Sequence, residues 1–157
     1  MPRALVMMKD VTDVNFAFVF DLSGSGRLVA LWANHTVLTK ASDQFQKLHR
    51  FNVPDWRNVT PSLWLLSVFV AWVLEDPLVP YCAMIRYLYT GQLELEVDMR
   101  QFLITEWPIQ ALAELREKKV NLNEVWAGPV RTLSLSELCE LAERYQLRGL
   151  VAACKRL

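Results

Sequence analysis

The stretch from Tyr81 to Gly91 constrains the fold more than any other part of this sequence. It reads Tyr-Cys-Ala-Met-Ile-Arg-Tyr-Leu-Tyr-Thr-Gly, with apolar residues at positions i, i+3, i+4 and i+7. That spacing predicts an amphipathic helix whose apolar face covers a small core. Gly91 follows as a residue that commonly ends helices. The rest of the chain must supply the surface that this helix covers.

A β-hairpin is predicted before this helix. Apolar residues alternate along one strand and lie on one face of it, at Val14, Phe16, Phe18 and Phe20. The segment Asp21–Gly26 supplies turn residues, and Arg27–Ala33 forms a second apolar strand. The glycines indicate a turn and not a phosphate-binding loop, because no Lys-Ser or Lys-Thr pair follows them.

Two strands are predicted on either side of the central helix. Ser67–Leu74 is rich in Val, Phe and Trp, which favour strands. Gln92–Val97 alternates apolar and polar residues, which predicts a strand with one wet face. A membrane-spanning reading of residues 58–74 is disfavoured, because a spanning helix needs roughly 20 apolar residues and polar residues interrupt this run. Pro80 suits the first turn of the central helix.

Helices are predicted after the hairpin and at the end of the chain. Helical structure is predicted between Asn34 and Leu48, with Ser42 as the cap of a second short helix. One buried face of this segment carries Val37, Leu38, Ala41, Phe45 and Leu48. Ser134-Leu-Ser-Glu137 is a capping box that opens a further helix. Its apolar face carries Leu135, Leu138, Leu141, Ala142 and Tyr145. A last short helix follows over 147–154.

Composition narrows the function classes. Hydrophobic residues make up 53% of the 157 residues, which indicates one globular domain with a core. The formal net charge is zero, so no charge field favours nucleic acid or anionic lipid. The three cysteines lie in apolar helical patterns, which indicates reduced, buried thiols and a cytoplasmic or nuclear protein. Residues 1–10 do not resemble a signal peptide.

Catalytic, metal and cofactor sites are not predicted. His35 and His49 are the only histidines, and no Cys-x-x-Cys or paired histidine spacing typical of zinc sites occurs. A cysteine nucleophile would need a histidine base and an orienting group. We therefore expect a protein that is not an enzyme.

The order of these elements, and four stretches within them, resembles the BTB/POZ domain. The stretches are Asp13-Val-Asn-Phe16, the segment Ala33–Phe45 with His35, Leu38 and Ser42, the helix Tyr81–Gly91, and Leu138–Cys154. The resemblance implies an α+β fold, with a small mixed sheet flanked by a cluster of short helices, over a single domain of residues 1–157. The residues that match the family pattern and are expected to be structural are Asp13, His35, Leu38, Ser42, Tyr87, Tyr89, Gly91 and Tyr145.

That resemblance also implies the function. BTB/POZ domains are protein–protein interaction modules that form homodimers, dock adaptors, link substrates to cullin scaffolds of ubiquitin ligases, or assemble transcriptional regulators. The expected partners are therefore proteins, with no direct nucleic-acid or membrane binding. The family's swapped dimer uses an N-terminal strand and helix, whereas only residues 1–12 precede Asp13 here. The loop after Phe45 lacks the glutamate of the family's cullin-binding signature.

An insertion at about residues 98–132 separates this chain from typical members. It offers an alternative function, in which a monomeric scaffold or transcription-regulatory domain binds one dedicated partner through the insertion. The candidate partner-binding residues in the loop and the insertion are Phe45, Leu48, His49, Phe51, Trp56, Trp107 and Trp126. The tryptophans among them serve either as partner contacts or, as we favour, as anchors that fold their segments back onto the domain.

Overall fold

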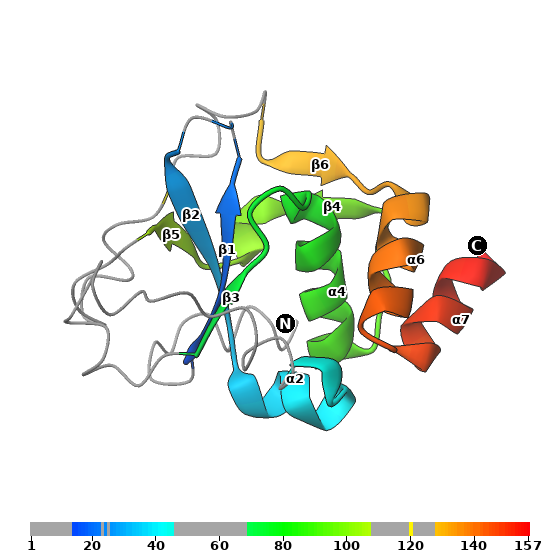
Figure 1. The fold of residues 1–157 in the computed structure, drawn as a ribbon. Helices are drawn as coiled ribbons and strands as arrows, with labels where there is room; N and C mark the ends of the chain where they lie inside the picture. The colour runs from blue at the N-terminus through cyan, green and yellow to red at the C-terminus, as the bar shows by residue number, and fades with distance from the viewer. Residues whose placement is uncertain (1–13, 23, 25, 46–68, 108–119, 121–127) are drawn as a thin grey trace.

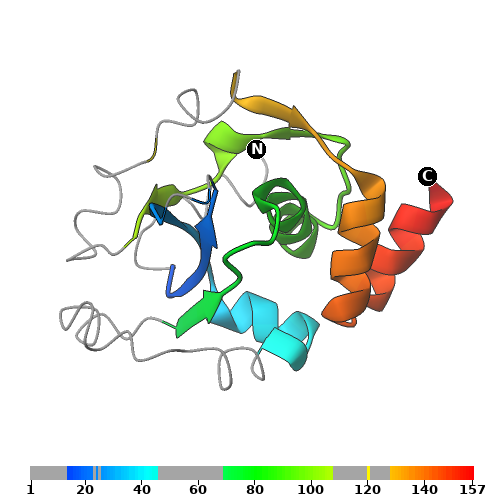
Figure 2. The same ribbon diagram turned by 45° about the horizontal axis from the view of Figure 1, so that its top comes forward.

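The expected α+β class is confirmed by the computed structural model, which describes residues 14–22, 24, 26–45, 69–107, 120 and 128–157 (Figure 1). A mixed four-stranded sheet lies on one side of the central helix and a helical hairpin on the other (Figures 1 and 2). None of the helices within these ranges is both long and apolar enough to cross a membrane.

The predicted hairpin forms the middle of the sheet. Strands β1 (Phe16–Asp21) and β2 (Leu28–Ala33) pair antiparallel, and β3 (Phe69–Trp72) pairs parallel to β1. Strand β5 (Ile104–Glu106) adds antiparallel to β2, so the strand order is β3-β1-β2-β5. All residues of 16–20 are fully buried. The sheet is therefore covered on both faces, which the one-sided prediction for β1 did not anticipate.

Helix α2 (His35–Ala41) begins immediately after the hairpin. The Asn34 side chain accepts hydrogen bonds from the backbone N–H groups of Thr36 and Val37, which caps the helix. The prediction that Ala41 is buried is wrong, because the helix ends there and leaves its side chain exposed. Ser42 accepts from the Gln44 N–H at 3.1 Å, as expected for a second cap.

Helix α4 (Leu78–Thr90) is the central helix of the fold. It begins three residues before the predicted start, and nine of its residues are buried. Gly91 ends it with a φ of 74°, and its N–H donates to the Tyr87 carbonyl at 2.7 Å. A left-handed backbone of this kind favours glycine, so the sequence signal for the helix end is confirmed.

A two-stranded ribbon lies beyond the end of α4. Strands β4 (Glu96–Asp98) and β6 (Val130–Thr132) pair antiparallel, and a 3-10 turn, η4 (Met99–Gln101), follows β4. The predicted strand over 92–97 is therefore shorter than expected and starts at Glu96. Both β5 and β6 fall inside the predicted insertion, so part of that insertion belongs to the sheets of the domain.

The two closing helices are α6 (Leu135–Arg144) and α7 (Arg148–Arg156). The Ser134 hydroxyl accepts from the Glu137 N–H at 3.4 Å, so the predicted N-cap is confirmed. Helix α6 packs against α4, and α7 packs against α6 on the far side from the sheet (Figure 2).

Candidate protein-interaction surface

A tight connection joins α6 to α7. Helix α6 ends at Tyr145, and Gln146 adopts a φ of 56°, an uncommon conformation for a residue other than glycine. The Leu147 N–H then donates to the Ala142 carbonyl at 2.8 Å. This reversal lays the two helices antiparallel and side by side (Figures 1 and 2).

The two helices bury one face and expose the other. The buried residues are Leu138, Leu141, Ala142, Tyr145, Leu147, Leu150 and Cys154. The exposed charges of the two helices differ in their balance. On α6 the exposed residues Glu137, Glu140 and Glu143 outweigh Arg144, whereas on α7 the exposed charged residues Arg148, Lys155 and Arg156 are all basic. The closing helical pair therefore presents a net acidic helix beside a basic helix.

A shallow groove of about 510 Å³ runs along this outer face. It is lined by Glu143, Gln146, Arg148, Val151, Ala152 and Lys155. Small apolar side chains at its floor and charged side chains at its rim are the composition of many protein interfaces. We call these six residues, with Glu140, the hairpin surface.

A polar network, buried at its tyrosines and exposed at Arg144, fixes α6 to the start of α4. The Asp76 carboxylate accepts from Tyr81 Oη at 2.7 Å and from Arg144 Nη1 at 2.7 Å. Tyr81 Oη also lies 2.7 Å from Tyr145 Oη. Because the single proton of Tyr81 is donated to Asp76, Tyr145 donates to Tyr81. The chain of hydrogen bonds orients the C-terminal end of α6, where the hairpin turns.

Electrostatics keep both tyrosines of this network neutral. Burial raises the pKa of Tyr145 to about 12. Burial, then the neighbouring Tyr145 and Asp76, raise the pKa of Tyr81 well above its ordinary value. Neither phenol therefore supplies an anionic nucleophile near neutral pH, and the network acts as a structural clamp.

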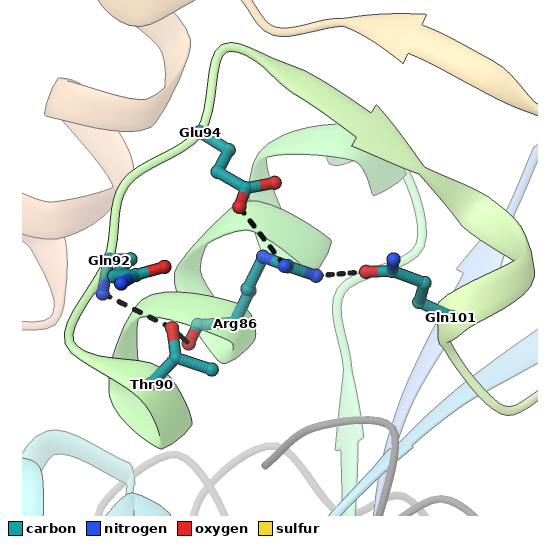
Figure 3. Close-up of polar contacts among 5 residues, drawn as sticks. All are labelled: Arg86, Thr90, Gln92, Glu94 and Gln101. Carbon is teal, nitrogen blue, oxygen red and sulfur yellow. Dashed lines mark hydrogen bonds and ion pairs between the residues drawn. The ribbon is translucent and has the colours of Figure 1, made fainter. Parts of the chain in front are cut away.

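A second polar cluster fixes the other end of α4 (Figure 3). Arg86 is only 7% exposed, and its guanidinium donates to Gln101 and, at 3.1 Å, to Glu94. Thr90 donates to the Arg86 carbonyl at 2.7 Å and accepts from the Gln92 N–H. The Arg86 Nε atom is buried without a hydrogen-bond partner in the described part of the chain. This cluster holds the loop after α4, and with it β4, against the helix.

The family-pattern residues that the structure describes come together around α2, α4 and α6. Tyr89 Oη accepts from the Asn34 N–H at 2.8 Å, which ties α4 to the cap of α2. Phe45 stacks on Tyr145 with ring centroids 4.7 Å apart. Leu38 is fully buried, and Tyr87 lies against Gly149 of α7. Asp13 lies outside the described residues.

His35 has a packing role here. Its ring stacks on Phe69 at 3.9 Å, and its backbone N–H donates to Asn15 Oδ1 at 2.7 Å. Partial burial lowers the pKa of the imidazole, so it is mainly neutral at physiological pH. The His35 ring therefore packs against β3, and its backbone is held to Asn15.

The candidate partner-binding residues divide into two groups. Phe45 is fully buried and Trp107 is 6% exposed, so their side chains pack the core and do not agree with a role as surface contacts. The ring centroid of Trp107 lies 6.1 Å from that of Trp32 and 6.2 Å from that of Trp72. This packing corresponds to the alternative in which the tryptophan anchors its segment on the domain. The candidates outside the described residues are Leu48, His49, Phe51, Trp56 and Trp126.

Several structural residues were not predicted from the sequence. Asn34 before a helix carries a recognisable cap signal, but Asp76 and Arg86 become important only through partners far along the chain. Thr105 is likewise fully buried, and its hydroxyl accepts from Trp32 Nε1 at 2.8 Å, a partner far along the chain. The segregated charges of α6 and α7 are visible in the sequence once the two helices are drawn as a pair.

No group of three or more possible metal ligands is found among the residues that the structure describes. Comparison with known proteins adds no family assignment: no protein-family model matches the chain, and no curated protein matches it.

Proposed function

We propose that this chain is a BTB/POZ-type protein–protein interaction module without chemistry of its own. It acts by self-association and by docking adaptor proteins, with a cullin scaffold of a ubiquitin ligase as the adaptor class that the family resemblance suggests. Its place is the cytosol or the nucleus. The three cysteines are free thiols in this structure, which supports a reducing compartment.

The convergence of the family-like stretches onto one core is the observation that carries this proposal. Residues far apart in the sequence meet there: Phe45 stacks on Tyr145, and Tyr81 joins Tyr145 through a hydrogen bond. Tyr81 also lies 5.1 Å from Phe18 between ring centroids. The element order of hairpin, α2, β3, α4 and a closing helical pair is the order on which the resemblance rests.

The hairpin surface is the contact that we assign to self-association. Its occupant is a second copy of this chain, because one helix is acidic and the other basic. In a two-fold dimer every contact occurs twice, once for each copy. Helix α6 of the first copy can therefore face α7 of the second, while α7 of the first faces α6 of the second. Complementary charges of this kind fix register and accelerate association more than they add affinity. The half-buried Val151 and exposed Ala152 supply the apolar centre.

A second candidate is binding of a dedicated partner through the insertion. Leu95 is 46% exposed and Val130 is 47% exposed, and both lie at the β4–β6 ribbon. Replacing residues 108–127 by a Gly-Ser linker of equal length keeps β5 and β6 and removes the side chains of that stretch. Under this candidate the chain is a monomer, and the replacement should abolish binding of the dedicated partner while the thermal unfolding midpoint is kept. If partner binding survives the replacement with the midpoint kept, the insertion hypothesis is wrong.

The direct test of the proposed function is the solution mass by light scattering at two well-separated concentrations. We expect the mass to rise toward twice the monomer mass with concentration. The double variant Glu140→Lys and Glu143→Lys places positive charge on both helices and should give a monomer at both concentrations. Lys40→Glu, on the exposed side of α2, is the matched control and should behave as the unmodified chain. A monomeric unmodified chain would overturn self-association.

A further inference from the structure

Two of the three cysteines lie on the two helices of the closing pair. Cys139 lies on α6, is half-buried and donates from its thiol to Glu143 at 3.9 Å, whereas Cys154 lies on α7 and is 8% exposed. Cys154 belongs to the hydrophobic core, and Cys139 packs against that core. Cys82 lies apart from them on α4 and is fully buried.

The two cysteines lie at similar distances along their helices from the turn that joins α6 to α7. Cys139 lies seven residues before Gln146, where the chain reverses, and Cys154 lies eight residues after it. At a rise of about 1.5 Å per residue, both positions are roughly 11–12 Å from the turn along antiparallel helices. The two helices pack against each other (Figures 1 and 2), so the cysteines lie at similar distances from the turn on contacting helices.

The spacing of the helices is suited to a covalent bridge. Packed helices have axes about 8–10 Å apart, and each Cα lies about 2.3 Å from its own axis. Cα atoms that face each other across such a pair of helices come within the about 4–7 Å that a disulfide spans. The proximity also has an electrostatic consequence: burial, and then the neighbouring Cys139 thiolate, raise the pKa of Cys154.

We propose that Cys139 and Cys154 are a redox modification site that forms a reversible intramolecular disulfide when the chain meets a low-molecular-weight disulfide such as oxidised glutathione. This site adjoins the hairpin surface, because the Cys139 thiol donates to Glu143 at 3.9 Å, but its oxidation does not require self-association. It converts the closing helical pair from two packed helices into a covalently stapled unit.

The exchange proceeds in two steps. Cys139 is the more exposed thiol, so its thiolate attacks one sulfur of the oxidant, forms a mixed disulfide and releases one glutathione thiolate. The Cys154 thiolate then attacks the Cys139 sulfur, forms the Cys139–Cys154 bond and releases the second glutathione thiolate. The two protons lost by the cysteines are taken up by the two leaving thiolates. The protein loses two electrons, and the oxidant gains them.

Cys82 is the internal control for this chemistry. Complete burial raises the pKa of its thiol well above the ordinary value, and thiolate formation is required for exchange. We therefore expect Cys82 to stay reduced in the folded chain under the same conditions.

The test is to incubate the purified chain with oxidised glutathione, block the remaining thiols with N-ethylmaleimide in denaturant, and determine intact and peptide masses. The expected product has lost two hydrogens, carries no glutathione, and has a single blocked cysteine, Cys82. Cys154→Ser should trap glutathione on Cys139, and Cys139→Ser should leave Cys154 reduced. Stable glutathione on Cys139 of the unmodified chain, or no oxidation of either cysteine, would overturn the proposal.

A stability readout separates a bridge in the folded chain from one formed after unfolding. A closed loop of this length constrains the unfolded chain, so the oxidised protein should have a Tm higher by roughly 6–12 °C, reversible with dithiothreitol. The Cys82→Ala variant should form the same bridge and show the same upward shift. An unchanged or lowered Tm on oxidation would mean that the native helices do not accommodate the bond.

Discussion

Strand β1 and the closing helical pair use their side chains in opposite ways. Every residue from Phe16 to Phe20 is fully buried, so these five residues of β1 offer no side chain to a partner. Helix α6 buries only Leu138, Leu141 and Ala142, and its remaining residues are half-buried or exposed. The strand therefore serves stability, whereas the helical pair divides its residues between the core and an outer surface. Substitutions in the two regions should separate folding from interaction.

The largest effect is expected from Phe18→Ala. The Phe18 ring lies 4.9 Å from Phe16 and 5.1 Å from Tyr81 between centroids, and no part of it reaches solvent. Its removal should lower the free energy of unfolding by about 3–5 kcal/mol, because transfer energy is lost and a cavity is left. Urea unfolding followed by circular dichroism measures this. Arg156→Ala, on the exposed side of α7 and outside the hairpin surface, is the control, and it should change the value by less than about 0.5 kcal/mol.

Removing the hydroxyl that links α4 to α6 should have the next largest effect. Tyr81→Phe deprives Asp76 of a donor and Tyr145 of an acceptor. A hydrogen bond to a charged group contributes about 1.5–3 kcal/mol, and we expect a loss of that order in urea unfolding. Tyr145→Phe is the second substitution of a double-mutant cycle. Because the two hydroxyls bond to each other, the double variant should lose less free energy of unfolding than the sum of the two single losses. Strictly additive losses would mean that the two hydroxyls do not act as one network.

The same network predicts a loss of stability at alkaline pH. An unfolded tyrosine ionises near pH 10, whereas burial raises the pKa of Tyr145 to about 12 in the folded chain. Between these values the unfolded chain has lost the proton that the folded chain keeps, so stability falls as pH rises. The thermal unfolding midpoint measured from pH 9 to pH 12 should decrease, with a shallower slope for Tyr145→Phe.

A smaller effect tests how closely α7 approaches α4. A Cβ on Gly149 would meet Tyr87 Oη at 3.0 Å, which is a tight contact with the tip of a side chain. Alanine in a helix is favoured over glycine by about 1 kcal/mol. Gly149→Ala should nevertheless leave the free energy of unfolding nearly unchanged, because the contact with Tyr87 Oη opposes that gain. On a Tyr87→Phe background the oxygen is absent, and Gly149→Ala should then stabilise by about 1 kcal/mol. Equal effects in both backgrounds would contradict the contact.

Sequence periodicity was sufficient where one element buries a regular face. The alternation of Phe16, Phe18 and Phe20 predicted β1, and the spacing from Tyr81 to Leu88 predicted most of α4. It was insufficient for β5, because Ile104–Glu106 is too short to show a period and is a strand only through its pairing with β2. A local pattern carries no information about such long-range pairing.

Polar partners and surfaces were harder to predict for a related reason. Asp76 is one of 17 acidic residues, and its link to Arg144 exists only once α4 and α6 are packed. The candidate list placed Phe45 on a surface because aromatic residues are frequent in interfaces, yet the same apolar area favours burial. For Trp107 the sequence left both roles open, and its burial agrees with the favoured one, an anchor. The charges of the closing helices are local, so their sign pattern could have been predicted.

The most direct measurement of self-association through the hairpin surface uses two complementary variants. One carries Glu140→Lys and Glu143→Lys on α6, and the other carries Arg148→Glu and Lys155→Glu on α7. Native mass spectrometry of each alone should give monomers, because like charges then face each other across the dimer. An equimolar mixture should give a heterodimer, because opposite charges are restored. Unchanged homodimers of either variant, or a mixture that stays monomeric while the unmodified chain dimerises, would contradict this account.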